Sequence, residues 1–476
     1  MSSLKWLTEK VSRVKKFFIQ LPTVAVLLPI QGISVFIWWI AGSYFGVDVY
    51  TSRIFPGDDT WCQPLTQGLG NHCWGDYYYT LVFINLDNPF LGETPNPYPA
   101  AALTLFMVFE LLTTLTGIAN FGVFAYITFM AATISYSVWF ATKSQSFEKR
   151  ITMFSTLVLL SPAVLAALDR GNSVGFLVPA AIWLFSSIRS GNTQQTLLSL
   201  ALLSVIKPHF GLVGLAFMVS GRVALGIKSL CLGAAVNVFA FLIFWPRDFP
   251  SNVFTWVQVL FRYQDYHSVA TLWPQNVSFA QSVYSFTYSM NLISGGIFAS
   301  TLEFLEKIQG LIGPAFLTFV FLGIYVFRKT LTMTQVCILA LSSITMTSAI
   351  SYYYYVVIAI PFLLSIENTK PHSLELNTKK SKAGHSDGDG INLVLWLASL
   401  LSLVQIPIPW ITFSASQIPI PWMSSWEVVV ASGVFVGGIW ILCYFVIFII
   451  LVRHFIIRKR LSSSAKSGHK KQVKMV

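Results

Sequence analysis

An acidic residue at the start of an apolar segment is the first candidate for chemistry. Asp76 lies near the start of GDYYYTLVFINLDNPFLGETPNPYPAAALTLF, residues 75–106, where a polar, aromatic-rich loop runs directly into an apolar run. Partial burial at such a boundary raises the pKa of a carboxyl group from about 4 toward neutrality, so that it can accept a proton from a hydroxyl group. Asp76 is therefore a candidate general base. A solvated surface aspartate or a helix cap is the alternative, and the same loop holds further carboxylates at Asp48, Asp58, Asp59 and Asp87.

Basic residues that could face an anion are also present. Lys207 interrupts the apolar run 196–221, where a charge should be paired or line a cavity, with snorkelling of the side chain to the interface as the alternative. Arg170 follows Asp169 between two short apolar segments, where an exposed turn would serve equally well. The other candidate cations are Arg247, Arg262 and His267.

The composition identifies the solvent around these residues. Of the 476 residues, 55% are hydrophobic and 11% charged, and the mean hydropathy is +0.66. Such a composition excludes a soluble core of this size. The uncharged runs 21–45, 229–245 and 429–452 approach or exceed the roughly 20 residues needed to cross a bilayer, and backbone groups in lipid must be paired within a helix. We expect an all-α, polytopic membrane protein with about nine to eleven crossings.

The net charge of +12 has a topological explanation. Lysines and arginines collect beside span ends, which is typical of cytoplasmic anchoring, so we expect no nucleic-acid partner. The opening KWLTEKVSRVKKFF carries five basic residues and precedes a full-length span, which indicates a retained anchor and a cytoplasmic N-terminus. The segments expected to face outward from a plasma membrane, and to hold the candidate site, are 46–98, 169–172, 246–283, 350–355 and 413–426.

The charge and hydropathy pattern divides the chain into segments. They are an amphipathic cytoplasmic segment 1–20, a membrane domain 21–366 with a long first outer loop 46–98, a flexible cytoplasmic loop 367–390, C-terminal membrane helices 391–452 and a basic tail 453–476. Two stretches do not fit simple crossings. Residues 99–141 are long enough for two spans, but Lys143 requires an odd number, so we expect one crossing and a half helix. Residues 196–221 return to the side they left, which predicts a broken, re-entrant hairpin.

Cysteines and soluble-enzyme motifs give little further chemistry. Cys62 and Cys73 share the first outer loop, where an oxidising exterior could join them, although two cysteines are a thin signal. The sequence has no P-loop, no dinucleotide-binding glycine loop, no HExxH and no Cys/His cluster. We therefore expect no cofactor and no ATP-driven pumping by this chain alone. A substrate must be taken from the membrane.

Several short motifs in order carry a resemblance to a known family. They are Gly75-Asp76, Asn88-Pro89-Phe90, Tyr98-Pro99, Arg170-Gly171-Asn172, Ile206-Lys207-Pro208, Asn276-Val277-Ser278 and the run from Tyr352 to Pro361. The chain resembles glycosyltransferase family 87 of the GT-C superfamily, the polyprenyl-phosphate-mannose-dependent α-mannosyltransferases of actinobacteria and their relatives. The resemblance extends to about residue 365. The last two apolar runs match nothing in the family.

The resemblance implies a direct displacement in which an acceptor hydroxyl group attacks the anomeric carbon and a lipid phosphate leaves. Asp76 would be the base, the donor would be a polyprenyl-phosphate sugar, and the acceptor a lipid-linked glycan or lipoglycan. The residues implied in binding the donor phosphate or sugar are Arg170, Asn172, Lys207, Asn276, Ser278 and Tyr354. An ordinary loop turn is the alternative for Asn276 and Ser278, and an interfacial aromatic belt for most of the tyrosines at 352–355.

Two departures from the family leave the reaction open. Gly171-Asn172 stands where relatives often carry Gly-Gln, and SAISYYYYVVIAIP, residues 348–361, lacks the histidine of their late motif. A polyprenyl-phosphate-arabinofuranose donor is one alternative, and a transporter or flippase of envelope glycolipids is another. A noncatalytic scaffold is a third. No metal site is predicted, although a phosphate group can recruit a divalent cation without leaving a trace in the sequence.

Overall fold

The computed structural model describes residues 25–34, 36, 74–84, 89–90, 98–262, 276–348, 351–367, 386–404, 407–408 and 430–472. The regular secondary structure of these residues is helical, apart from an antiparallel pair of two-residue strands, β1 (Pro407–Ile408) and β2 (Val430–Ala431), and an isolated bridge between Asn276 and Tyr352. The all-α prediction is therefore confirmed for the described part of the chain. The N-terminal segment 1–20, most of the outer loop 46–98 and the proposed cysteine pair, Cys62 and Cys73, lie outside it.

Five helical stretches are long and apolar enough to cross a membrane. They are α5 (Phe121–Ala141), Ser173–Ser190 with η3 (Ser173–Phe176) and α8 (Leu177–Ser190), α11 (Val223–Phe244), α14 (Ala299–Val326) and Ser432–Ile457, most of it in α18 (Val436–Gln472). A sixth, Phe147–Leu159 with Pro162–Arg170, is bent by 47°. Seven shorter apolar helices accompany them in the described residues, so the predicted nine to eleven crossings stay a prediction.

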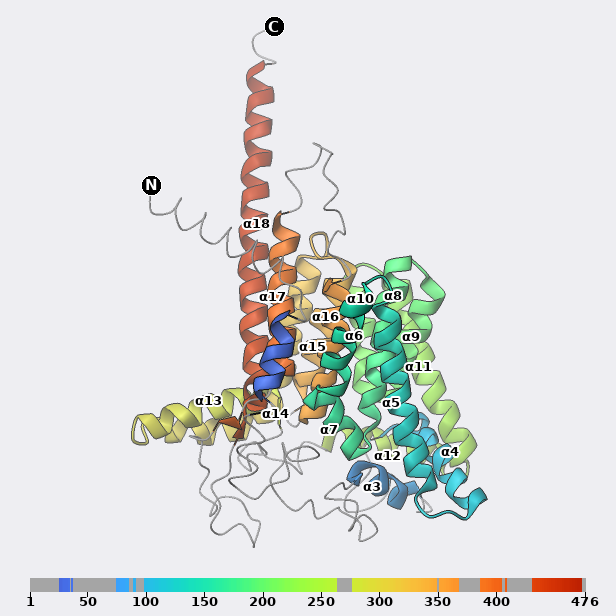
Figure 1. The fold of residues 1–476 in the computed structure, drawn as a ribbon. Helices are drawn as coiled ribbons and strands as arrows, with labels where there is room; N and C mark the ends of the chain where they lie inside the picture. Colours follow the sequence, from blue (N-terminus) through green and yellow to red (C-terminus); the bar gives the residue numbers. More distant parts are fainter. Residues whose placement is uncertain are drawn as a thin grey trace.

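The remaining helices complete the bundle. They are α3 (Gly75–Ile84), α4 (Ala100–Thr116), α6 (Phe147–Phe154), η2 (Ser155–Leu159), α7 (Pro162–Arg170), α9 (Thr193–Ile206), η4 (Pro208–Leu212), α10 (Val213–Val219), α12 (Phe249–Arg262), α13 (Phe279–Ile293), α15 (Met333–Thr347), η7 (Tyr353–Ile358), α16 (Ala359–Glu367), α17 (Ser386–Leu403) and η9 (Ser432–Phe435). In Figure 1, α3, α7 and α12 lie at the end of the bundle opposite the C-terminus, and α13 lies crosswise to α18.

The chain breaks at Lys207, as the sequence predicts. Lys207 has an extended backbone, with φ −149° and ψ 130°, because it ends α9 and precedes a proline that cannot continue the helix. The chain then folds back, since a β-carbon on Gly211 would lie 3.2 Å from that of Ser204. A broken hairpin therefore replaces a continuous helix, and its break presents Lys207 to the interior.

The stretch 99–141 does not form two membrane-spanning helices of equal length. Gly117, with φ 66°, ends α4 in the left-handed conformation, and the chain then turns into α5. The aromatic rings of Phe106 and Tyr126 stack with centroids 5.2 Å apart, which pairs the two helices. Only α5 reaches spanning length; α4 is one of the shorter apolar helices.

Small residues allow close packing between α10 and α11. A β-carbon on Gly226 of α11 would collide with the backbone oxygen of Gly214 in α10. One on Gly214 would lie 2.7 Å from the hydroxyl oxygen of Ser229. Close backbone approach through glycine and serine is the usual way for helices to associate in an apolar medium. This packing holds the broken hairpin against α11.

Candidate functional site

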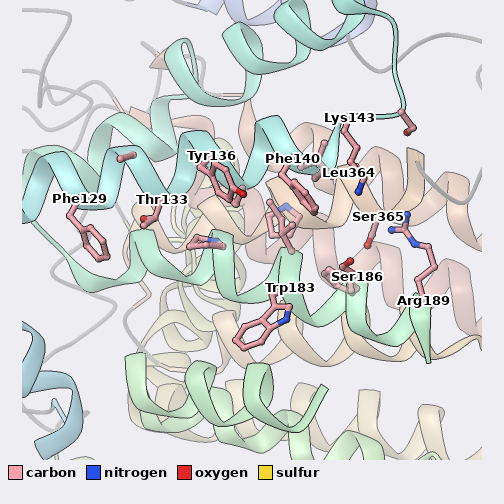
Figure 2. Close-up of a pocket in the computed structure, with 18 residues that line it drawn as sticks. Phe129, Thr133, Tyr136, Phe140, Lys143, Trp183, Ser186, Arg189, Leu364 and Ser365 are labelled. Atoms are coloured by element: carbon pink, nitrogen blue, oxygen red, sulfur yellow. The ribbon is translucent and has the colours of Figure 1, made fainter. Parts of the chain in front are cut away.

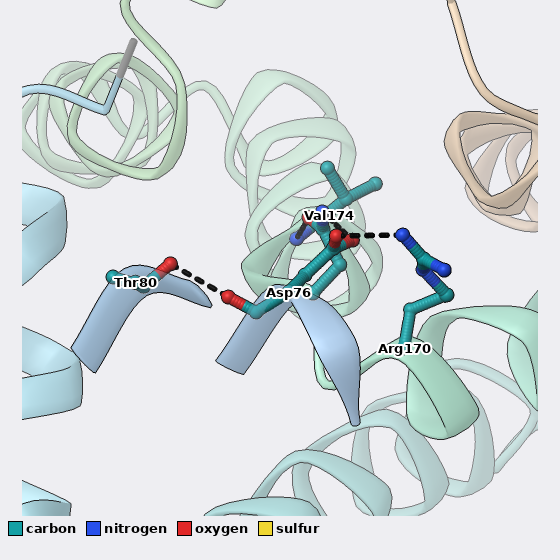
Figure 3. A network of polar contacts seen from close by, with 5 residues as sticks. Asp76, Thr80, Arg170 and Val174 are labelled. Carbon is teal, nitrogen blue, oxygen red and sulfur yellow. Dashed lines mark hydrogen bonds and ion pairs between the residues drawn. The ribbon is translucent and has the colours of Figure 1, made fainter. Parts of the chain in front are cut away.

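Residues from separate helices meet at the carboxylate of Asp76. The Nη2 of Arg170 donates to Asp76 Oδ1 at 3.0 Å, and the Nδ2 of Asn172 donates to Asp76 Oδ2 at 2.7 Å. Figure 3 shows the Arg170 guanidinium directed at Asp76 from the end of α7. The structure thus brings together the two short motifs Gly75-Asp76 and Arg170-Gly171-Asn172. The side chains of Asp76 and Arg170 are 18% and 17% exposed, so the ion pair is mostly but not completely buried.

The turn after α7 orients the amide of Asn172. Gly171, with φ 62°, ends α7 in the left-handed conformation that glycine adopts without strain. Asn172 then begins η3, and its Oδ1 accepts a hydrogen bond from the backbone N–H of Val174 at 3.0 Å. Because the amide oxygen is used by the backbone, the amide nitrogen points to Asp76.

The entry into α3 is strained and tied to the same turn. Trp74 has φ 41°, which is rare for a bulky residue, and its N–H donates to the backbone oxygen of Asp169 at 3.0 Å. A β-carbon on Gly171 would lie only 2.9 Å from that of Tyr77. These contacts fix α3 against the end of α7, and strained residues of this kind are most common at functional sites.

Lys207 contributes a buried amino group. It is 8% exposed, and its Nζ lies 3.5 Å from the centroid of the Tyr98 ring, which is a cation–π contact. Its charge also favours the ionised form of Asp76. The sequence predicts a partner or a cavity for this side chain, and the structure gives it the Tyr98 ring and the nearby Asp76 carboxylate. The sequence singled out Tyr98 only as part of a motif, and its role beneath the lysine was missed.

The position of Asp76 changes its acidity. The helix α3 is short and lies outside the candidate spans. Burial raises the pKa of Asp76 above its ordinary value of 3.8, and this effect exceeds the opposing effects of the Asn172 hydrogen bond and the Lys207 charge. A hydrogen bond with Tyr354 also opposes the shift, whereas the nearby Asp169 adds to it. The carboxylate is therefore a stronger base than an exposed aspartate.

The tyrosines at 352–355 form a wall inside the protein. The rings of Tyr352 and Tyr354 stack with centroids 5.4 Å apart, and those of Tyr354 and Tyr355 with centroids 5.3 Å apart. Tyr353, Tyr354 and Tyr355 are buried. The interpretation of most of these residues as an interfacial aromatic belt was wrong, because η7 packs against α7 and η3, and Tyr353, Tyr354 and Tyr355 are buried there. Tyr354 lies at the Asp76 site, where it forms a hydrogen bond with the carboxylate.

The side chains of Asn276 and Ser278 accept hydrogen bonds from backbone N–H groups near the tyrosines. Asn276 Oδ1 accepts from the N–H groups of Ser351 at 3.0 Å and Ser278 at 3.1 Å. The Ser278 hydroxyl oxygen caps α13 by accepting from Gln281 N–H at 3.0 Å. Both side chains are fully buried. The structure thus brings Asn276 next to Tyr352 and gives it a positioning role, whereas Ser278 lies at a helix cap.

The other candidates are separate from this cluster or outside the described residues. Arg247 is exposed on the segment before α12. His267 and the competing carboxylates Asp48, Asp58, Asp59 and Asp87 lie outside the described residues, as does the side chain of Arg262. Within the described part of the chain, no group of three or more His, Cys, Asp or Glu side chains could hold a metal ion.

The cluster combines a partly exposed base, buried and half-buried cations, and aromatic rings. A carboxylate in this setting can accept a proton, and the cations can stabilise an anion that develops nearby. Comparisons with protein-family models, with characterised proteins and with solved structures find no match to this chain.

Proposed function

We propose that the protein is a membrane glycosyltransferase. It moves a sugar from a polyprenyl-phosphate donor to a hydroxyl group of a lipid-linked glycan or lipoglycan on the extracytoplasmic side. The observation that carries the proposal is the convergence of Asp76, Arg170, Asn172 and Lys207 from separate parts of an apolar helical bundle. Mannose as the sugar rests on the resemblance to family 87 alone.

The reaction is a single displacement. The oxygen of the acceptor hydroxyl group forms a bond to the anomeric carbon, and the bond from that carbon to the phosphate oxygen breaks. The electron pair of the broken bond leaves with the lipid phosphate, and the hydroxyl proton passes to the carboxylate of Asp76. Attack opposite the leaving group inverts the anomeric centre.

The cations of the cluster have distinct roles in this proposal. Lys207 supplies a desolvated charge for the departing phosphate, which is worth more in a low dielectric than in water. A guanidinium has five N–H donors, so Arg170 can contact a phosphate oxygen while its Nη2 stays on Asp76. Asn172 holds the other carboxylate oxygen and orients the base.

Sugar transfer tests the proposal directly. Membranes carrying the wild type or Asp76→Asn, at matched expression, receive radiolabelled polyprenyl-phosphate-mannose and an extract of native lipoglycans. The variant should lose transfer by a factor of about 100 to 10,000, which is the usual contribution of a general base. Asp248→Asn is the matched control, because Asp248 is an exposed acid before α12.

The outcomes separate the assignments. Unchanged transfer by Asp76→Asn would overturn Asp76 as the base. No transfer by the wild type from either mannose or arabinofuranose donors would overturn glycosyl transfer and direct attention to transport. Thermal unfolding of the purified variants shows whether a loss of transfer comes from the chemistry or from the fold.

A further inference from the structure

A large apolar cavity lies on another part of the bundle. It has a volume of about 710 Å³ and is lined by α5, α8 and α16. Its walls include Phe129, Tyr136 and Phe140 of α5, which are 47%, 69% and 47% exposed, and Trp183 of α8. Figure 2 shows these side chains along the cavity. In a membrane, such aromatic walls are covered by an apolar chain.

Two basic residues lie at one end of this cavity. Lys143 follows α5, and Arg189 lies in the last turn of α8. Figure 2 shows their side chains beside Ser365 and Ser186, which supply hydroxyl groups. The lining contains no carboxylate, and neither Lys143 nor Arg189 has an ion pair within the described part of the chain. Among the described residues, no carboxylate therefore neutralises Lys143 or Arg189.

The cavity has one basic and one apolar end, and this difference predicts the orientation of a bound lipid. From Phe129 to its end at Ala141, α5 rises about 18 Å, which exceeds the roughly 15 Å depth of hydrocarbon in one leaflet. The basic end is the end at which the positive-inside pattern predicts cytoplasm. A polyprenyl-phosphate with its phosphate at Asp76 would have the opposite polarity, because Phe129 contacts Phe176 of η3, close to Asn172. A lipid with its phosphate at the basic end of the cavity would therefore lie in the opposite direction to the donor.

We propose that this cavity binds an anionic glycerophospholipid from the leaflet at the Lys143 end. Lys143 and Arg189 contact the headgroup phosphate, and one acyl chain lies along the aromatic wall toward Phe129. The contact of Lys143 Nζ with the Phe140 ring, at 4.3 Å from the centroid, holds the ammonium where the headgroup meets the apolar wall. The lipid would wedge between α5 and α16 and stabilise the bundle.

Lipid titration with native mass spectrometry tests this site. The full-length protein, delipidated in detergent, is titrated with phosphatidylglycerol or with phosphatidylcholine of identical acyl chains. We expect phosphatidylglycerol to bind the wild type at least tenfold more tightly. The variant Lys143→Ala/Arg189→Ala should weaken phosphatidylglycerol binding roughly 10- to 30-fold, from the contribution of two basic residues near an anionic lipid, and leave phosphatidylcholine unchanged.

A matched pair of basic residues provides the control. Lys228→Ala/Arg328→Ala removes one lysine and one arginine, both exposed and both outside the cavity lining. This variant should bind both lipids as the wild type does. A second test fills the cavity: Ser186→Trp should weaken binding of both lipids, because the indole would occupy the space of the acyl chain.

Three results would overturn the proposal. They are equal affinity of the wild type for the two lipids, unchanged phosphatidylglycerol binding by the Lys143→Ala/Arg189→Ala variant, and an equal loss in the control variant. Unchanged lipid binding by Ser186→Trp would overturn the placement of the acyl chain. Size-exclusion profiles identify any variant that fails to fold, and the neutral lipid then provides the internal reference. None of these measurements depends on sugar transfer.

Discussion

The carboxylate of Asp76 and the guanidinium of Arg170 form an ion pair across 3.0 Å, although 94 residues separate them in the sequence. Each partner is brought to this position by an unusual backbone conformation next to it. Trp74 enters α3 with a positive φ, and Gly171 ends α7 in the left-handed conformation. The pair is thus positioned by two turns, and it joins α3 to α7 at a partly exposed site.

The geometry of Arg170 should matter beyond its charge. Arg170→Lys keeps the positive charge but replaces the planar fork by a single ammonium, which cannot hold Asp76 and a phosphate at once in the same way. We expect kcat/KM for sugar transfer to fall by roughly 10- to 100-fold, a loss of about 1.4 to 2.8 kcal/mol. Arg247→Lys, at an exposed position before α12, should leave it unchanged. Wild-type kinetics in Arg170→Lys would contradict a role for the guanidinium.

The pH dependence of transfer should report the environment of Asp76. The base must be ionised to accept a proton, and burial raises its pKa above 3.8. Transfer should therefore rise with pH through the pKa of Asp76, and it should be lost on acidification at a higher pH than an exposed aspartate would require. The measurement is kcat/KM against pH, with recovery of activity on return to neutral pH as the control for unfolding. An acidic limb at or below 3.8 would contradict the raised pKa.

Gly171 should be intolerant of a side chain for two separate reasons. Gly171→Ala places a β-carbon at φ 62° and 2.9 Å from the β-carbon of Tyr77. Gly191→Ala is the matched control, since Gly191 has φ 70° and open space around it. The control should lose only the left-handed penalty of roughly 1–2 kcal/mol. Gly171→Ala should lose more in thermal unfolding and also reduce transfer, because it displaces Arg170 and Asn172. Equal melting temperatures for the two variants would argue against the close packing of α3 on α7.

The helix contact between α10 and α11 predicts opposite effects on stability for two glycine-to-alanine substitutions. A β-carbon on Gly226 would collide with the backbone oxygen of Gly214, whereas one on Gly323 of α14 meets nothing within 4 Å. Gly323→Ala should stabilise the protein by up to about 1 kcal/mol through helix propensity. Gly226→Ala should destabilise it by about 1–3 kcal/mol through overpacking. Thermal unfolding in one detergent distinguishes them, and a stabilising Gly226→Ala would refute the contact.

The sequence was most informative where neighbouring residues allow only one backbone conformation. Long apolar runs must be helices in lipid, and a lysine followed by proline within such a run must break it, so the helical class and the break at Lys207 could be predicted. Asp76 could be chosen from its position at the start of an apolar segment. In each case the reason lies within a few residues along the chain.

The sequence was least informative where two segments share a surface. Aromatic residues near a span end suit a lipid interface or a protein interior equally well, and only the packing of η7 on α7 and η3 showed that Tyr353, Tyr354 and Tyr355 are buried. Asn276 reads as a polar loop residue, yet its amide oxygen binds the backbone of Ser351, 75 residues away. Such contacts depend on the path of the whole chain.

The sequence by itself determined the solvent, the helical class, the break in the apolar run at Lys207 and the short list of charged residues that an apolar environment cannot hold without a partner. Tertiary structure alone decided which of those charges meet. It placed Arg170 and Asn172 on the two oxygens of Asp76, Lys207 over Tyr98, and the tyrosine wall beside them. The physical reason is that burial and pairing of a charge are properties of the surrounding volume, and segments distant in the sequence fill that volume.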